Sequence, residues 1–364
     1  MVEEGPLSEA EALARKHPIS AFSLDALIAG AAKLRPERLA LTEAGSGTAT
    51  RALAYGEFDS QVRALAQQLT ELGLAPGERI LIVAGARTAC VAATLAALAA
   101  GLEPLLVPVG LEGARLGEIA RSAGCVAIAG PSAYGPLNLE DVLFEGAASS
   151  EIVRFVATLG PGQADGAIDL APERLRPSRV QLPHFGEARP RLGTLNSQGE
   201  PLFHEQSALL AAALDLVGKA RIAASSNILS TLSPASFASF VSGPVASLLS
   251  GAPLALFGPF EAASFVALLE ALAPCHCVCP ATILPDLQRA GLLRNDVLAS
   301  MIAVRRRDGA LQFEGDCPLI DVQALGESGI DVQRTTPAKS QPAPISGEVL
   351  APVPPLQQAE RSWR

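Results

Sequence analysis

Residues 194–202 carry the kinds of groups that hold phosphate. The segment reads Thr-Leu-Asn-Ser-Gln-Gly-Glu-Pro-Leu. Hydroxyls and backbone amides can bind phosphate oxygens, and a glycine lets the chain approach them closely. The segment holds one glycine and no Lys or Arg, so nothing in it neutralises a polyanion. Two interpretations stay open: an ordinary surface loop between a strand and a helix, or a residual anion-binding loop that uses Thr194, Asn196, Ser197 and Gly199.

A second candidate is the run Cys275-His276-Cys277-Val278-Cys279. Thiolate and imidazole are good zinc ligands. In a strand, however, alternate residues point the same way, so the three cysteines are expected to form one buried row. Free cysteine packs as a small hydrophobe, and no second cysteine pair lies nearby at finger-like spacing. We therefore expect core packing, with metal or thiol chemistry at Cys275, Cys277 and Cys279 as alternatives.

The composition is that of a well-packed protein. Of 364 residues, 49% are hydrophobic and 18% charged, and the net charge of −9 argues against binding nucleic acid through a broad basic surface. The apolar stretch 88–102 is short for a membrane span, and prolines interrupt the longer stretch 222–260. The start of the chain is polar and lacks the apolar core of a secretion signal. We expect a cytoplasmic protein with no membrane or nucleic-acid partner.

Helical and strand patterns alternate along the chain. The first series predicts helices over 57–72, 88–100 and 111–123, and strands over 80–83, 105–108 and 125–129. The second predicts helices over 206–217, 237–249, 262–272 and 283–290, and strands over 227–232, 253–257, 275–279 and 300–305. Residues 131–190 are expected to form loops and short strands. This alternation predicts an α/β protein with largely parallel sheets covered by helices.

The two series predict two α/β subdomains. The first spans residues 1–180, and the second spans residues 181–335 and carries the 194–202 segment. Residues 336–364 are rich in proline and are expected to be an extended or disordered tail.

Several short motifs occur in a recognisable order. The motifs L-T-Y-x-E-L, G-(L/V)-x-x-G-D-R-V, L-K-A-G-x-x-x-V-P, L-x-x-G-A and P-T are matched by Leu53–Phe58, Gly73–Ile80, Leu98–Gly101 with Val107–Pro108, Leu249–Ala252 and Pro280–Thr282. On these motifs, residues 24–330 resemble the adenylate-forming superfamily of acyl- and aryl-CoA synthetases, peptide-synthetase adenylation domains and luciferases. The resemblance implies the fold of that superfamily's large N-terminal domain.

The motif that holds ATP phosphates in this superfamily, T-S-G-T-T-G-x-P-K, is altered here. Thr194, Ser197, Gly199 and Pro201 remain, whereas the lysine is replaced by Leu202. His204 follows this segment and could meet an anion, but we expect it to be an exposed histidine at a helix start.

Two further motifs of the superfamily are altered. The motif Y-G-x-T-E, which stacks adenine and places a glutamate near magnesium, is best matched by residues 325–329. Gly326 and Ser328 remain as candidate nucleotide contacts, while the glutamate has become Gly329 and Glu327 could replace it only in a shifted register. The motif P-x-x-H places Phe237 where the family has a histidine beside the acyl pocket. Because the sequence stops at residue 364, we also expect the small C-terminal domain with its catalytic lysine to be absent.

Three functions remain open. The first is an acyl-CoA synthetase-like scaffold that has lost adenylation activity, needs no cofactor, and binds a carboxylic acid, an acyl group, an acyl-carrier or ligase partner chain, or a second copy of itself. The second is an active AMP-forming acid–thiol ligase that uses ATP and magnesium and is completed by a separate chain. The third is thiol or metal chemistry at the three cysteines.

Overall fold

The computed structural model describes residues 22–45, 48–160, 164–172, 174–175, 182, 189–306, 311, 313–326 and 328–336. Most of the predicted tail, and Glu327, lie outside these residues. No helix in these ranges is both long and apolar enough to cross a bilayer.

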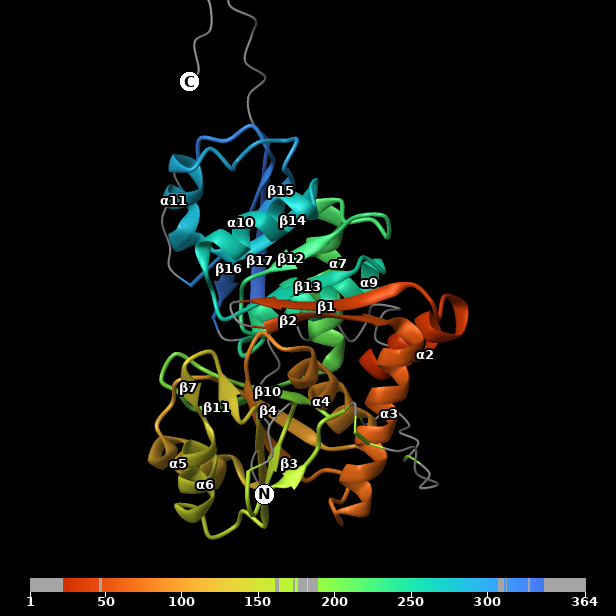
Figure 1. The fold of residues 1–364 in the computed structure, drawn as a ribbon, viewed down its shortest axis with the longest axis vertical. Coiled ribbons are helices and arrows are strands. Elements are labelled where there is room, and N and C mark those ends of the chain that lie inside the picture. Colours follow the sequence, from red (N-terminus) through yellow and green to blue (C-terminus); the bar gives the residue numbers. More distant parts are fainter. Residues whose placement is uncertain are drawn as a thin grey trace, which may run out of the picture.

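Two mostly parallel sheets form the framework (Figure 1). In spatial order, the strands of the larger sheet are β17 (Gly329–Thr335), β16 (Leu319–Leu325), β15 (Leu298–Arg305), β14 (Cys275–Pro280), β12 (Ile228–Ser230), β13 (Leu254–Phe257), β1 (Leu39–Gly45) and β2 (Thr48–Ala54). Those of the smaller sheet are β11 (Pro201–His204), β10 (Leu192–Leu195), β4 (Glu103–Pro108), β3 (Arg79–Ala84), β5 (Cys125–Gly130), β8 (Phe155–Thr158) and β9 (Ile168–Asp169). Strands β2, β11 and β17 pair antiparallel with their neighbours. A separate hairpin pairs β6 (Ala133–Tyr134) with β7 (Leu137–Asn138).

Helices connect the strands and cover the sheets. They are α2 (Leu24–Leu34), α3 (Tyr55–Glu71), α4 (Thr88–Ala99), α5 (Gly113–Ala123), α6 (Glu140–Ala148), α7 (Gln206–Ala220), α8 (Phe237–Phe240), α9 (Ala246–Ser250), α10 (Ala262–Ala271) and α11 (Leu284–Arg289). The predicted α/β class is therefore confirmed. The predicted helix over 237–249 is interrupted by a π-helical turn at Val241–Val245, which contains Pro244. Proline has no amide hydrogen to donate, so the regular helical ladder breaks there.

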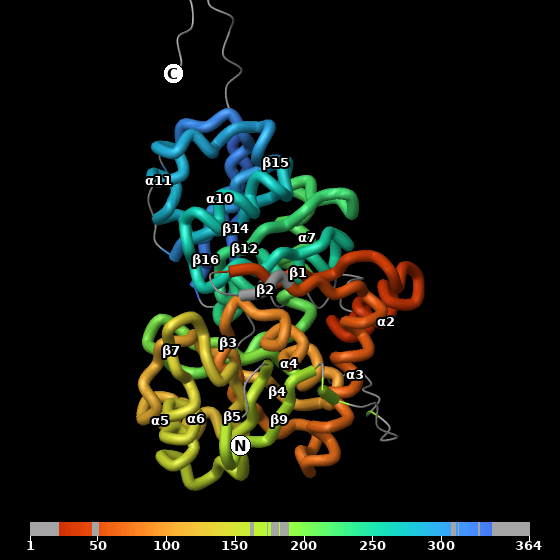
Figure 2. Tube along the Cα trace, in the orientation of Figure 1, coloured from red at the N-terminus to blue at the C-terminus, as the bar shows by residue number. Residues whose placement is uncertain are grey.

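Each sheet contains strands from both of the predicted subdomains. Leu39–Ala54 adds two strands to the sheet that is otherwise built from residues 228–335, and β1 pairs in parallel with β13. Figure 2 shows the red β1 among the green and blue segments. Leu192–His204 likewise joins the smaller sheet through β4. A boundary near residue 180 therefore does not separate the sheets, because strand pairing between distant segments is not encoded in local periodicity.

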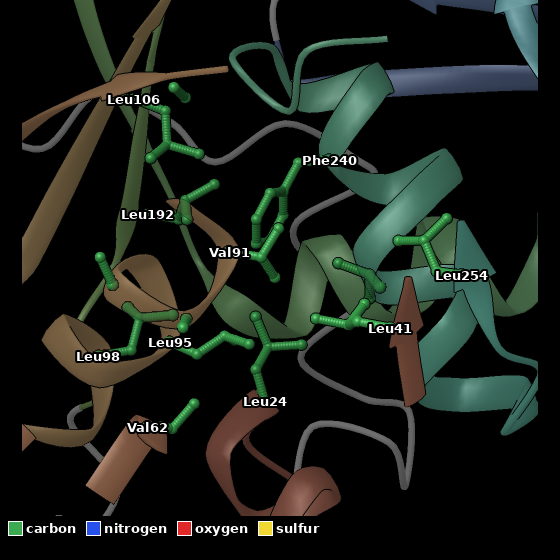
Figure 3. Close-up of a cluster of buried hydrophobic side chains, with 14 of the residues drawn as sticks. Leu24, Leu41, Val62, Val91, Leu95, Leu98, Leu106, Leu192, Phe240 and Leu254 are labelled. Carbon is green, nitrogen blue, oxygen red and sulfur yellow. The ribbon is translucent and has the colours of Figure 1, made fainter. Parts of the chain in front are cut away.

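The main core lies between the two sheets, around α4. Every residue of α4 is buried, and the helix contacts β1 as well as β3 and β4. Its alanines allow this close approach on several sides. Figure 3 shows Val91 of α4 and Phe240 of α8 near the centre of the cluster.

A buried carboxylate joins the larger sheet to the start of this helix. Glu43 of β1 accepts hydrogen bonds from the Thr88 amide at 2.9 Å and the Thr88 hydroxyl at 3.0 Å. It also forms an ion pair with Arg87, with 2.5 Å between Nη1 and Oε1. A negative charge at a helix N-terminus interacts favourably with the helix dipole and caps its free amides.

Replacing Glu43 by Ala is expected to lower the free energy of unfolding by roughly 3 kcal/mol, because it removes a buried ion pair and a helix cap together. Urea unfolding followed by far-UV circular dichroism measures this change. The matched control is Asp59→Ala, which removes the surface pair with Arg63 and should cost no more than about 0.5 kcal/mol. Equal effects for the two variants would contradict the role assigned to Glu43.

Candidate functional site

The carboxyl ends of strands from the two sheets face each other. Ser233, just after β12, donates a hydrogen bond to the carbonyl of Ala84, the last residue of β3. At the same edge, within the larger sheet, the Gly258 amide just after β13 donates to the Ala44 carbonyl of the neighbouring β1 at 3.0 Å. Ligands of open α/β sheets bind beside the carboxyl ends of strands. Because β10 runs parallel to β4, residues 196–200 leave the smaller sheet at this same edge.

Residues 196–200 form a tight turn between β10 and β11 rather than the loop between a strand and a helix that one interpretation predicted. The Asn196 side-chain oxygen accepts hydrogen bonds from the amides of Gln198 at 3.0 Å and Glu200 at 2.8 Å. The Asn196 amide donates to the Glu200 carbonyl at 2.8 Å, and the Gly199 amide donates to the Asn196 carbonyl at 3.0 Å. Four backbone amides of the turn are thus bonded within the turn itself.

Gly199 and Arg115 hold the outer side of the turn. Gly199 has a φ of 78°, which favours glycine, and a Cβ there would lie 2.9 Å from the Arg115 guanidinium. Arg115 Nη2 donates to the Gly199 carbonyl at 3.0 Å, while Nη1 pairs with Glu118 at 2.9 Å. The sequence gives no signal for this arginine, because it lies 84 residues from Gly199 and carries no motif.

Thr194 points into the protein rather than toward a ligand. Its side chain is buried, and Oγ1 lies 2.8 Å from His204 Nε2. The prediction that His204 is exposed at a helix start is wrong: only 2% of the residue is exposed, and it is the last residue of β11. Its ring packs edge-on against Phe237, with ring centroids 4.9 Å apart. Three residues singled out from the sequence therefore meet, but as an interior contact.

Gly326 and Ser328 lie in the turn that joins β16 and β17. Gly326 has a φ of 53°. The turn geometry alone therefore accounts for a glycine there.

Ser197, in the 196–200 turn, also makes a contact within that turn: its hydroxyl donates to Gln198 Oε1 at 3.1 Å.

The three alternate cysteines of β14 are buried side by side in one cluster of the core, as predicted. Burial raises the pKa of Cys275, and the neighbouring Cys279 thiol together with burial raises that of Cys277. Protonated thiols are poor nucleophiles and poor metal ligands. No cluster of three or more His, Cys, Asp or Glu side chains in the described part of the chain is arranged to hold a metal ion.

A small cavity lies away from the facing edges. It is lined by Ala40, Leu41, Tyr55, Phe58, Val91, Leu95, Pro244, Ser247 and Leu248 and has a volume of about 10 Å³. That volume holds about one water molecule. It is too small for a carboxylic acid substrate.

Comparison with known proteins agrees with this architecture. A family model for AMP-binding enzymes matches residues 28–169, the segment that runs from α2 to β9. A salicyl-AMP ligase/salicyl-S-ArCP synthetase of Mycobacterium tuberculosis is 34% identical over 101 residues, which are 28% of this chain and 18% of that protein. The match thus spans less than a fifth of the relative's length.

Solved structures match over more of the chain. Apo MbtA of Mycobacterium smegmatis has a TM-score of 0.74 at 20% identity and covers 91% of this chain, which in turn covers 62% of it. The N-terminal domain of FACL13 from Mycobacterium tuberculosis has a TM-score of 0.68 at 15% identity, with 84% and 76% covered. The chain has the fold of the N-terminal domain of adenylate-forming enzymes. The shared fold, together with the family match over residues 28–169, agrees with the resemblance seen in the motifs.

His276 of β14 lies between Cys275 and Cys277 and provides a test of how this strand packs. Burial and the positive charge of Arg334 lower its pKa from 6.5 to about 4, and Nδ1 lies 2.8 Å from Ser300 Oγ. Between pH 6.5 and 4 the unfolded chain binds a proton at this histidine that the folded chain does not. Stability from this group is therefore complete above pH 6.5 and is lost as the pH falls toward 4, by up to about 3 kcal/mol.

The His276→Gln variant should show a correspondingly shallower loss of unfolding free energy between pH 7 and pH 4 than the unchanged protein. Urea unfolding at a series of pH values measures both slopes. Identical slopes would show that His276 does not titrate in this way.

Proposed function

We propose that this chain is an adenylate-forming scaffold that no longer forms acyl-adenylates and instead serves as a binding or assembly protein. The observation that carries the proposal is the closed turn at 196–200. The AMP-binding fold is retained, whereas the groups that would hold triphosphate at this turn are bonded to one another.

The chemistry of nucleotide activation explains why this matters. Adenylation depends on donors and cations that stabilise charge on the phosphates and on the leaving pyrophosphate. In the turn, the amides of Gln198 and Glu200 already donate to Asn196, and the Glu200 carboxylate adds negative charge. Arg115, a cation that contacts the turn, is shared between Glu118 and a backbone carbonyl. These residues do not fit ATP with magnesium as a resident cofactor.

The proposed binding role follows from the retained fold. Phe237, at the position of the family's histidine, is apolar and is buried against His204. We therefore expect any bound carboxylic acid or acyl group to be held mainly by apolar contact. An acyl-carrier chain, a ligase partner or a second copy of this chain remains a candidate partner, and the cytoplasm remains the proposed location.

The second candidate is an active AMP-forming acid–thiol ligase completed by a separate chain. The match to the AMP-binding family and the similarity to a salicyl-AMP ligase favour it. In that case ATP would have to open the turn and displace the Asn196 side chain from two amides.

Calorimetric titration with Mg·ATP separates the two candidates. The unchanged protein is expected to show no saturable binding at millimolar nucleotide and no pyrophosphate exchange with a panel of aliphatic and aromatic acids. The double variant Asn196→Gly, Leu202→Lys frees two amides and adds a cation. It should bind the nucleotide at least about tenfold more tightly than the unchanged protein, because each charge-assisted hydrogen bond contributes about 1.5 kcal/mol or more.

The single variants are the matched controls. Leu202→Lys adds the charge while the amides stay occupied, and Asn196→Gly frees the amides without adding charge, so each should gain less than the double variant. Tight Mg·ATP binding and acid-dependent pyrophosphate exchange by the unchanged protein would reject the scaffold proposal in favour of the ligase.

A further inference from the structure

The β6–β7 hairpin, residues 133–138, pairs with neither main sheet and reaches across the facing carboxyl edges. Its strands bond only to each other in the described sheets. Tyr134 projects from it between Gly85, just after β3, and Gly258, just after β13. Gly135 lies against Pro259 of the larger sheet's loop.

Tyr134 fits closely at this position. Its hydroxyl accepts a hydrogen bond from the Ala86 amide at 3.4 Å, and the Arg87 guanidinium lies 5.4 Å from the ring centroid. A Cβ added at Gly85 would come within 2.6 Å of the ring, and one at Gly258 within 2.2 Å of the hydroxyl oxygen. Both glycines therefore leave the space that the tyrosine occupies.

We propose that the hairpin at 133–138 is a lid over the junction of the two sheets, held closed by the side chain of Tyr134.

The hairpin is held by few contacts, so it can lift while the rest of the protein stays folded. Tyr134 is half-buried, whereas the other five residues, 133 and 135–138, are exposed. An isolated two-stranded hairpin is marginally stable in water, and the anchoring hydrogen bond is long. Opening the lid therefore exposes one aromatic ring, separates that ring from Arg87 and Gly135 from Pro259, and breaks one weak hydrogen bond. These few contacts place it among the low-energy local openings of a folded protein.

The groups beneath the lid are held independently of it. Arg87 is paired with Glu43, and Glu43 also caps α4. The junction therefore keeps its shape when the hairpin lifts, and the space between Gly85 and Gly258 becomes accessible. This space lies where α/β sheets bind ligands, and the proposal holds whether or not a nucleotide binds at the 196–200 turn.

Cys90 provides a reporter inside the same protein. It is fully buried on the first turn of α4, and its thiol lies 3.7 Å from the Val83 carbonyl at the end of β3. Burial raises the pKa of Tyr134, the Ala86 amide and Arg87 lower it by less, and the Cys90 thiol lies near enough to Tyr134 to raise it slightly. Cys125 is equally buried at the start of β5, the opposite end of the parallel strands.

Thiol labelling with N-ethylmaleimide, resolved by peptide mass spectrometry, tests the lid under native conditions. In the unchanged protein, Cys90 is expected to label at least about tenfold faster than Cys125, because local opening requires less free energy than global unfolding. The Tyr134→Ala variant should label faster still at Cys90 and at an unchanged rate at Cys125. Leu137→Ala, an exposed position on the same hairpin, is the matched control and should leave both rates unchanged.

Equal labelling rates for Cys90 and Cys125 in the unchanged protein would overturn the proposal, because access would then require global unfolding. Tyr134→Ala leaving the Cys90 rate unchanged would also overturn it. If the Tyr134→Ala variant unfolds, its Cys125 labelling rate will rise as well. The comparison of Cys90 with Cys125 in the unchanged protein then still tests the lid.

Discussion

The Asn196 carboxamide holds the turn between β10 and β11 closed. One side-chain oxygen accepts from two amides at 2.8 and 3.0 Å, where an anion would otherwise accept. Aspartate and asparagine close turns in this way without any ligand. The closed turn sets the β10–β11 register, which places Thr194 opposite Leu202 and brings the Thr194 hydroxyl to His204. Residues 196–200 thus form a hairpin turn whose amides are bonded within the turn itself.

The junction between the sheets is organised by a second constraint, the burial of Glu43. Its carboxylate links β1 of the larger sheet to Arg87 and Thr88 at the start of α4. A buried charge must be paired and hydrogen-bonded, so this contact fixes where α4 begins and where Arg87 lies. The Arg87 guanidinium in turn lies over Tyr134 of the hairpin. One ion pair thus supports the core helix and the base of the proposed lid.

The sequence predicted those features that depend on local pattern. Helices such as Tyr55–Glu71 and buried strands such as Arg79–Ala84 follow from apolar spacing, and the row of cysteines in β14 follows from strand alternation. Strand pairing between distant segments could not be read this way, which is why the membership of Leu39–Ala54 in the larger sheet was missed. The burial of His204, on β11, was missed for a similar reason, because its partner Phe237 lies on α8, far along the chain.

The most direct test of this account is the response of the turn amides to nucleotide in an amide-resolved NMR titration. With Mg·ATP added to millimolar concentration, the resonances of Gln198, Gly199 and Glu200 are expected to stay in place, because these amides donate within the turn. Saturable shifts of these resonances would show that the turn opens to hold phosphate and would contradict the account.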